Sequence, residues 1–281
     1  MAAAASAPVR ELVTVFPDDK AAVFRGGRLF ELGPMVRAYG ADGNRDFDEP
    51  ILTPDGQLAP ATDIAVDPDR SFAVSTTKGI ALLNARGIQT GFFATEEFRP
   101  RNIAVTEDHS IWVYGTASTR EKLDTDYDVL RRYSRDGAPV GSYIRRSTFP
   151  ADRKARIPFE LTELMASGNE VVLRAQGDLI RLDSDGRVSA RMRLDDLPMQ
   201  DFRRFVFTSD RRIYGCGDKG GFQASLVLFD LQAGTWKEMA SPEPCGFGLL
   251  GSDEATLVFK KFKRSRDDRM VTLQWFEQPR D

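Results

Sequence analysis

The chain has 281 residues, of which 41% are hydrophobic and 29% charged, a composition ordinary for a soluble globular protein. Its 39 basic and 42 acidic groups leave a net charge of -3, so no global positive field favours a nucleic acid as the partner. No stretch approaches 18 consecutive apolar residues, so we expect no insertion into a membrane.

The first ten residues, MAAAASAPVR, allow two interpretations. They lack the basic start and the long apolar run of an intact signal peptide, so residues 1–8 are expected to be a disordered tail. The run AAAASA also resembles the small-residue end of a signal peptide whose front has been removed. We expect a periplasmic or secreted protein, and a cytoplasmic one is the alternative.

Strands are expected along almost the whole chain. Residues 9–16, VRELVTVF, form a first apolar strand. From residue 20 onward, apolar runs of four to seven residues alternate with turns rich in Gly, Pro and Asp. Each unit contains a hairpin turn in which glycine supplies a positive φ. These turn glycines are separated by 44, 50, 49 and 48 residues, at Gly43, Gly87, Gly137, Gly186 and Gly234.

A period of this length, with four short strands in each unit, is the sequence pattern of β-propeller blades. Five complete units cover residues 20–51, 62–94, 102–146, 159–194 and 204–240, and a sixth, 246–278, has three strands. Residues 9–16 supply the outer strand that the sixth blade lacks, and they close the ring without an open edge. The fold predicted is therefore all-β: a six-bladed β-propeller with four-stranded antiparallel blades, one domain over residues 9–281, expected to be a monomer.

Two blades open in the same way, with TDIAVDPD at residues 62–69 and RNIAVTED at residues 101–108, and a Tyr/Leu-x-x-Asp-Gly turn recurs. These motifs resemble the six-bladed propellers with NHL-like or gluconolactonase-like repeats. The resemblance implies the fold and says little about function, because propellers host many unrelated activities. Gluconolactonase-like propellers hold a divalent cation at the channel mouth, which implies Asp63, Asn102 and Glu160 as metal ligands of a lactonase or related hydrolase.

The predicted starts of the inner strands place five polar residues at the channel mouth, Lys20, Asp63, Asn102, Glu160 and Arg203, which we take as candidate ligand-binding residues. Lys20 and Arg203 would repel a dication in the same ring. The favoured interpretation is therefore a non-catalytic binding or scaffold propeller that has no cofactor and uses one rim and the channel mouth. The metal-dependent lactonase or hydrolase is the alternative.

Templates for catalysis are absent from the sequence. The single histidine, His109, falls in the first turn of the third blade, where a solvated surface residue is expected. Without a second histidine no H-E-x-x-H site exists, and neither a G-x-S-x-G motif nor a phosphate-binding loop is present. Two acidic stretches are read as a hairpin turn and a solvent-facing strand, with calcium as the minor alternative: Asp183, Asp185 and Gly186, and Asp42, Asn44, Asp46 and Asp48.

The two cysteines, Cys216 and Cys245, fall on the same rim in neighbouring blades. A disulfide between them is geometrically conceivable and would imply an oxidising compartment. Two buried, unlinked thiols are the other interpretation, and the sequence leaves both open.

The longest connections lie on that rim, at residues 117–126, 145–160, 194–204 and 261–269, and several are rich in Arg and Lys. Insertions on one face of a repeat array often mark the binding face. A basic rim would suit an acidic protein, peptide or saccharide partner. Aspartates are interleaved with the basic residues, however, and mixed charge is also ordinary for a soluble surface.

Overall fold

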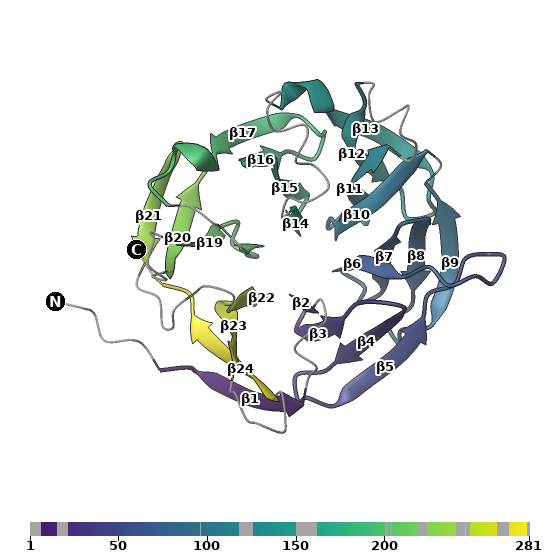
Figure 1. Cartoon of the computed structure of the whole chain (residues 1–281), viewed down its shortest axis with the longest axis horizontal. Coiled ribbons are helices and arrows are strands. Elements are labelled where there is room, and N and C mark those ends of the chain that lie inside the picture. Colours follow the sequence, from purple (N-terminus) through teal and green to yellow (C-terminus); the bar gives the residue numbers. More distant parts are fainter. Residues whose placement is uncertain are drawn as a thin grey trace.

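The computed structural model describes residues 7–15, 22–95, 97–117, 126–149, 162–199, 202, 204–218, 224–239, 245, 248–262 and 270–279. Within these ranges, 24 strands form six four-stranded antiparallel sheets, which stand like blades around a central channel (Figure 1). The predicted six-bladed β-propeller is confirmed.

Each blade begins with a strand at the channel and proceeds outward. The first three blades contain β2 (Ala22–Arg25), β3 (Arg28–Glu31), β4 (Met35–Tyr39) and β5 (Arg45–Pro50); β6 (Ala61–Val66), β7 (Phe72–Thr76), β8 (Gly79–Leu83) and β9 (Gln89–Ala94); and β10 (Phe98–Val105), β11 (Ile111–Ala117), β12 (Asp128–Tyr133) and β13 (Pro139–Arg145). The other three contain β14 (Glu163–Ser167), β15 (Glu170–Ala175), β16 (Asp178–Leu182) and β17 (Val188–Arg193); β18 (Phe205–Phe207), β19 (Ile213–Asp218), β20 (Ala224–Asp230) and β21 (Thr235–Met239); and β22 (Leu249–Asp253), β23 (Thr256–Phe262), β24 (Met270–Glu277) and β1 (Arg10–Val15).

The ring closes where the first strand of the chain meets the last. β1 pairs with β24 in antiparallel register from Arg10 opposite Trp275 to Val15 opposite Met270, and Figure 1 shows the two strands side by side. Because β1 completes the sixth blade, the predicted closure by the N-terminal strand is confirmed, and the outer edge of β24 is covered.

The hydrophobic core lies between neighbouring blades. In one such layer, Ala65 and Ile80 of the second blade pack with Ile103 and Val113 of the third, and all four are at least 95% buried. The blades are rich in Val, Ile and aromatic residues, which fit the pleated surface of a strand packed on both faces. A single blade cannot bury both faces alone, so each blade is stabilised by its two neighbours.

The predicted turn glycines join the third and fourth strands of their blades, and all five have φ between +67° and +88°. At Gly186 a side chain would also collide with the neighbouring blade, because a Cβ built there lies 2.0 Å from the ring of Tyr143. Gly87 and Gly137 have the same relationship to Phe47 and Phe93. These glycines therefore let the turn of one blade pack flat on an aromatic ring of the preceding outer strand.

Candidate binding site in the central channel

A cavity of about 990 Å³ occupies the channel at the ends of the inner strands. It opens on the face formed by the hairpins between the first and second strands of the blades, which we call the first-turn face. All six blades contribute to its lining. The walls are apolar and include Val66, Ile103, Leu164, Ala166 and Phe207.

The rim of the cavity is acidic. Five carboxylates and two guanidinium groups are among its lining residues, namely Asp67, Glu107, Asp210, Asp253 and Glu254, with Arg25 and Arg211. Arg211 lies 3.6 Å from Glu170, outside the cavity. Within the described ranges, the exposed side chains of Glu107 and Glu254 make no hydrogen bond or ion pair.

The shape of the rim is set by one kind of turn that recurs in three blades, at residues 67–71, 106–110 and 208–212. The fourth residue of each turn adopts a positive φ, 68° at Arg70, 63° at His109 and 64° at Arg211. In two of the turns the hydroxyl of the opening threonine donates to the aspartate two positions later, as Thr106 Oγ1 does to Asp108 Oδ1 at 2.6 Å. Such side-chain bonds stabilise tight turns locally, so each rim turn is specified by its own short sequence.

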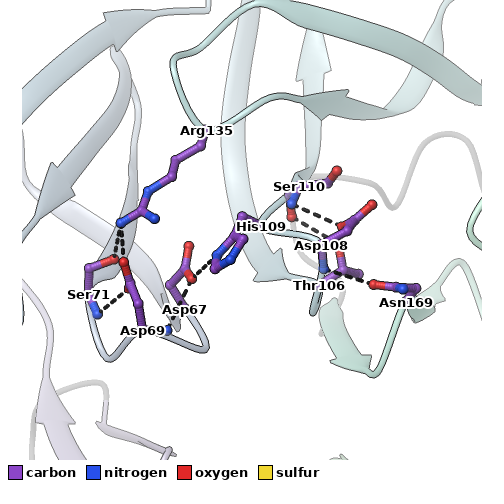
Figure 2. Close-up of polar contacts among 9 residues, drawn as sticks. All are labelled: Asp67, Asp69, Ser71, Thr106, Asp108, His109, Ser110, Arg135 and Asn169. Atoms are coloured by element: carbon purple, nitrogen blue, oxygen red, sulfur yellow. Dashed lines mark hydrogen bonds and ion pairs between the residues drawn. The ribbon is translucent and has the colours of Figure 1, made fainter.

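Polar contacts between blades join two of these turns, 67–71 and 106–110, to each other and to other turns of the third and fourth blades, as Figure 2 shows. The Nδ1 atom of His109 lies 2.5 Å from Oδ1 of Asp67, in the turn of the preceding blade. Arg135 pairs with Asp69 across the same boundary. The backbone N–H of Asp108 donates to Oδ1 of Asn169, in the next blade, at 2.9 Å.

His109 occupies the turn predicted for it, but its side chain is more than a solvated surface group. Its side chain is 42% exposed, whereas the Asp67 side chain that it contacts is 6% exposed. The ring therefore bridges two blades at the rim of the cavity. This contact could not be predicted from a local pattern, because its two residues are 42 positions apart.

At the inner end of the channel, the structure brings together two of the five residues predicted at the channel mouth. The buried carboxylate of Asp63 accepts from the backbone N–H groups of Ile64 (2.9 Å) and Ile103 (3.1 Å). The Nδ2 atom of Asn102 lies 3.4 Å from Oδ2 of Asp63. These contacts fasten the second blade to the third, and neither side chain lines the cavity. The other three predicted residues lie outside the described residues: Lys20, Glu160 and Arg203.

Glu163 was not predicted as a site residue, and it joins the fourth blade to the fifth as Asp63 joins the second to the third. Its carboxylate accepts from the backbone N–H of Phe205 at 2.8 Å. The guanidinium groups of Arg204 and Arg174 lie 3.5 and 3.6 Å away. The available signal was the position of each acid, directly before the apolar run of an inner strand, as in Asp63-Ile64 and Glu163-Leu164.

Burial raises the pKa of both carboxyl groups. For Asp63, desolvation outweighs the Arg25 guanidinium and the N–H groups of Ile103 and Ile64, which pull the pKa down. For Glu163, desolvation outweighs the combined effect of Arg204, Arg174 and Arg25, whose positive charges lower the pKa. Arg25, which also lines the cavity, lowers the pKa of both carboxyl groups.

The metal site that the gluconolactonase-like resemblance implies does not fit the described part of this ring. Both oxygens of Asp63 already accept N–H bonds. The amide of Asn102 faces two partners, Asp63 Oδ2 and the hydroxyl of Thr162, which donates to Asn102 Oδ1 at 2.6 Å. Arg25 adds positive charge beside Asp63, where a dication would be repelled. The arrangement is suited to holding blades together.

Comparison with known proteins supports the fold and leaves the family open. No family model matches the sequence, and no curated protein matches it either. Solved structures that share the fold include the calcium-binding protein regucalcin from Agrobacterium tumefaciens, which is 11% identical with a TM-score of 0.54, over 92% of this chain and 90% of that one. The Pan2 WD40 domain of Neurospora crassa is 12% identical with a TM-score of 0.57, over 92% and 91% of the two chains. A chain of the mitotic checkpoint complex is 10% identical with a TM-score of 0.55, over 94% and 79%.

These likenesses are at the level of the propeller fold alone. The resemblance to NHL-like repeats therefore stays a prediction, although a gluconolactonase-like propeller is among the structural neighbours. None of the helical segments in the described part of the chain is long and apolar enough to span a membrane.

The propeller joins Cys216 and Cys245 in a disulfide. Their Sγ atoms are 2.26 Å apart and their Cα atoms 5.5 Å apart, the latter within the usual range for a disulfide. Cys216 belongs to β19 in the fifth blade, and Cys245 precedes β22 in the sixth. Of the two interpretations that the sequence left open, the structure has the linked one.

The other acidic candidates have local partners. The carboxylate of Asp183 accepts from the backbone N–H groups of Asp185 and Arg187, which closes a hairpin turn. On the first blade, Asp42 accepts from the backbone N–H of Asn44, and two ion pairs follow, Arg28 with Asp46 and Arg37 with Asp48. Among the described residues, no group of three His, Cys, Asp or Glu side chains could hold a metal ion.

Most of the predicted basic rim lies outside the described residues, at 118–125, 150–161 and 263–269. Of its described members, Arg145 pairs with Asp128 at 3.3 Å, and Arg146 lies over the ring of Tyr127. The connections that carry this rim follow the second and fourth strands of the blades, so the rim is on the face opposite the first-turn face.

Proposed function

We propose that this propeller is a non-catalytic binding module that takes its ligand into the channel cavity from the first-turn face. The observation that carries the proposal is the cavity itself, about 990 Å³ of space lined by all six blades. This is the upper end of the range for ligand pockets, which are mostly apolar with a few polar groups that orient the ligand.

The rim of the cavity is held in place by contacts between its turns, and this preorganisation supports the proposed binding role. Contacts such as His109 with Asp67 and Asn169 with Asp108 hold neighbouring turns in place before any ligand arrives. A preorganised site loses less conformational entropy on binding, so more of the contact free energy appears as affinity. The buried carboxylates Asp63 and Glu163 are engaged in contacts between blades, which supports a structural role for them.

A scaffold role is compatible with the same fold, since one structural neighbour is a chain of the mitotic checkpoint complex. We also propose that the protein works in an oxidising compartment, the periplasm or the outside of the cell. The disulfide between Cys216 and Cys245 supports this, because disulfides persist in such compartments.

A thermal-shift screen tests the binding role. Small molecules and short peptides are added to the wild-type protein and to two variants with a filled cavity, Ala166→Phe and Val66→Phe, whose side chains line the wall. A ligand of the native state raises Tm by mass action. We expect compounds that raise the Tm of the wild type and leave both variants unshifted. If every stabilising compound shifts all three proteins equally, the cavity is not the binding site.

A further inference from the structure

We propose that the occupant of the cavity is a peptide segment of a partner protein that inserts a Lys or Arg side chain, flanked by apolar residues, into the channel mouth. The inference rests on the proposed binding function and names the ligand class for the same site. Two independent properties of the cavity support it, the charge of the rim and the apolar character of the walls.

The charge of the rim selects a cation. Five carboxylates face two guanidinium groups around the lining, and one of these, Arg211, lies against Glu170. Asp210 is balanced by Arg212 at 3.1 Å, but Glu107 and Glu254 make no ion pair with any described residue. A concave site with apolar walls concentrates such a field, so the mouth attracts positive charge and repels acidic segments.

The apolar walls favour a ligand whose cationic group is carried on an apolar side chain. Inside the rim, the cavity is bounded by side chains such as Val66, Leu164, Ala166 and Phe207. A small hydrated cation would leave these walls uncovered. Lys and Arg carry three or four methylenes that can cover apolar surface while the charged group stays near the carboxylates.

The size of the cavity selects a peptide over one isolated side chain. A volume of about 990 Å³ is that of a pocket for a drug-sized ligand, so residues flanking the cation enter as well. Burial of these flanking apolar groups adds the non-directional part of the affinity. The charge then sets the specificity and the rate of association.

The test uses pentapeptides with blocked ends and the sequence Ala-Leu-Lys-Leu-Ala. In matched peptides, norleucine or Glu replaces Lys, so norleucine keeps the stem and removes the charge. Binding to the full chain is followed by fluorescence anisotropy. We expect the Lys peptide to bind at least about tenfold more tightly than the norleucine peptide and to weaken between about 50 mM and about 500 mM salt, as screening predicts. Equal affinities, or no binding of the Lys peptide, would overturn the proposal.

Protein variants locate the effect. Glu107→Gln combined with Glu254→Gln removes two rim charges while keeping side-chain size, and neither residue has a described side-chain partner whose loss would disturb the fold. We expect at least about fivefold weaker binding of the Lys peptide and no change for the norleucine peptide. The control is Asp185→Asn, which removes one exposed charge from a third-to-fourth-strand turn outside the cavity and should leave both affinities unchanged. An unchanged Lys peptide affinity in the double variant contradicts the proposal.

Two further measurements separate this inference from the proposed function. Spermine carries positive charge without apolar flanks, and we expect it to bind at least about tenfold more weakly than the Lys peptide; an equal affinity would replace the peptide by a small polycation. If uncharged ligands bind the wild type and are lost in Ala166→Phe while the Lys peptide does not bind, the cavity is a binding site and the cationic peptide is the wrong ligand class.

Discussion

The imidazole of His109 and the carboxylate of Asp67 meet at 2.5 Å across the boundary between the second and third blades, at the rim of the cavity. We expect His109→Asn and Asp67→Asn each to lower the free energy of unfolding by about 1 kcal/mol. Asn is chosen for position 109 because it tolerates the positive φ of 63° there. Urea unfolding of both single variants and the double variant forms a cycle. The coupling should be about 0.5–1 kcal/mol, and strictly additive effects would show that the contact contributes no stability.

The contact of Gly186 with Tyr143 predicts that an alanine substitution destabilises the protein more at Gly186 than at Gly234, although both glycines have a positive φ. Gly186→Ala and Gly234→Ala both place a side chain at positive φ, +80° and +67°, which costs about 1–2 kcal/mol. A Cβ at Gly186 also meets the Tyr143 ring, whereas nothing lies within 4 Å of one at Gly234. We expect the Gly186 variant to lose about 1–3 kcal/mol more in urea unfolding. Equal losses would contradict the packing role of this turn.

The fold could be predicted because its information is local and repeated. Turn glycines at a regular spacing and short apolar runs fix the number of blades, and the deficit in the last blade matches the extra strand at the start. Strand limits were less accurate where proline intervenes. β10 begins at Phe98, four residues before its predicted start at Asn102. Pro100 has no N–H to donate, and a bulge between Pro100 and Asn102 allows the strand to continue through it.

The site could not be predicted to the same extent, because its contacts join residues of different blades. Asp63 was identified as a polar residue of the channel, but its bond to the N–H of Ile103 depends on how two blades pack. The cavity and its acidic rim depend on side chains from all six blades. The rim turns were partly visible, since TED at 106–108 and TSD at 208–210 share the Thr-x-Asp pattern that their hydrogen bonds use.

The disulfide predicts the behaviour of the thiols and a loss of stability on reduction. Cys216 and Cys245 are buried and separated by 29 positions. A cross-link of that span lowers the entropy of the unfolded chain and so stabilises the folded state by about 3–4 kcal/mol. Protein unfolded without reductant should show no reactive thiol in a titration, and reductant should lower Tm. Cys216→Ser with Cys245→Ser serves as the control, whose Tm should not respond to reductant. Two reactive thiols in the unreduced protein would contradict the linkage.

The raised pKa of Asp63 predicts how stability changes with pH. Because burial raises the folded-state pKa above the unfolded value of about 3.9, the folded state binds the proton more tightly. The wild type therefore gains stability as the pH falls through the folded-state pKa, a gain that Asp63→Asn lacks. We expect the difference in unfolding free energy, wild type minus variant, to increase as the pH is lowered from 7 to 4 in urea titrations.

Asp69 provides the control of opposite sign. The hydroxyl and the backbone N–H of Ser71, with Arg135, hold the pKa of this carboxyl well below its usual range. Its contribution is present above the unfolded pKa and is lost as the pH falls through the folded one, so the wild type minus Asp69→Asn difference must decrease toward acid. Asp69 is partly exposed, so solvent screening keeps this change small. Parallel slopes for the two variants would show that burial does not control the titration of Asp63.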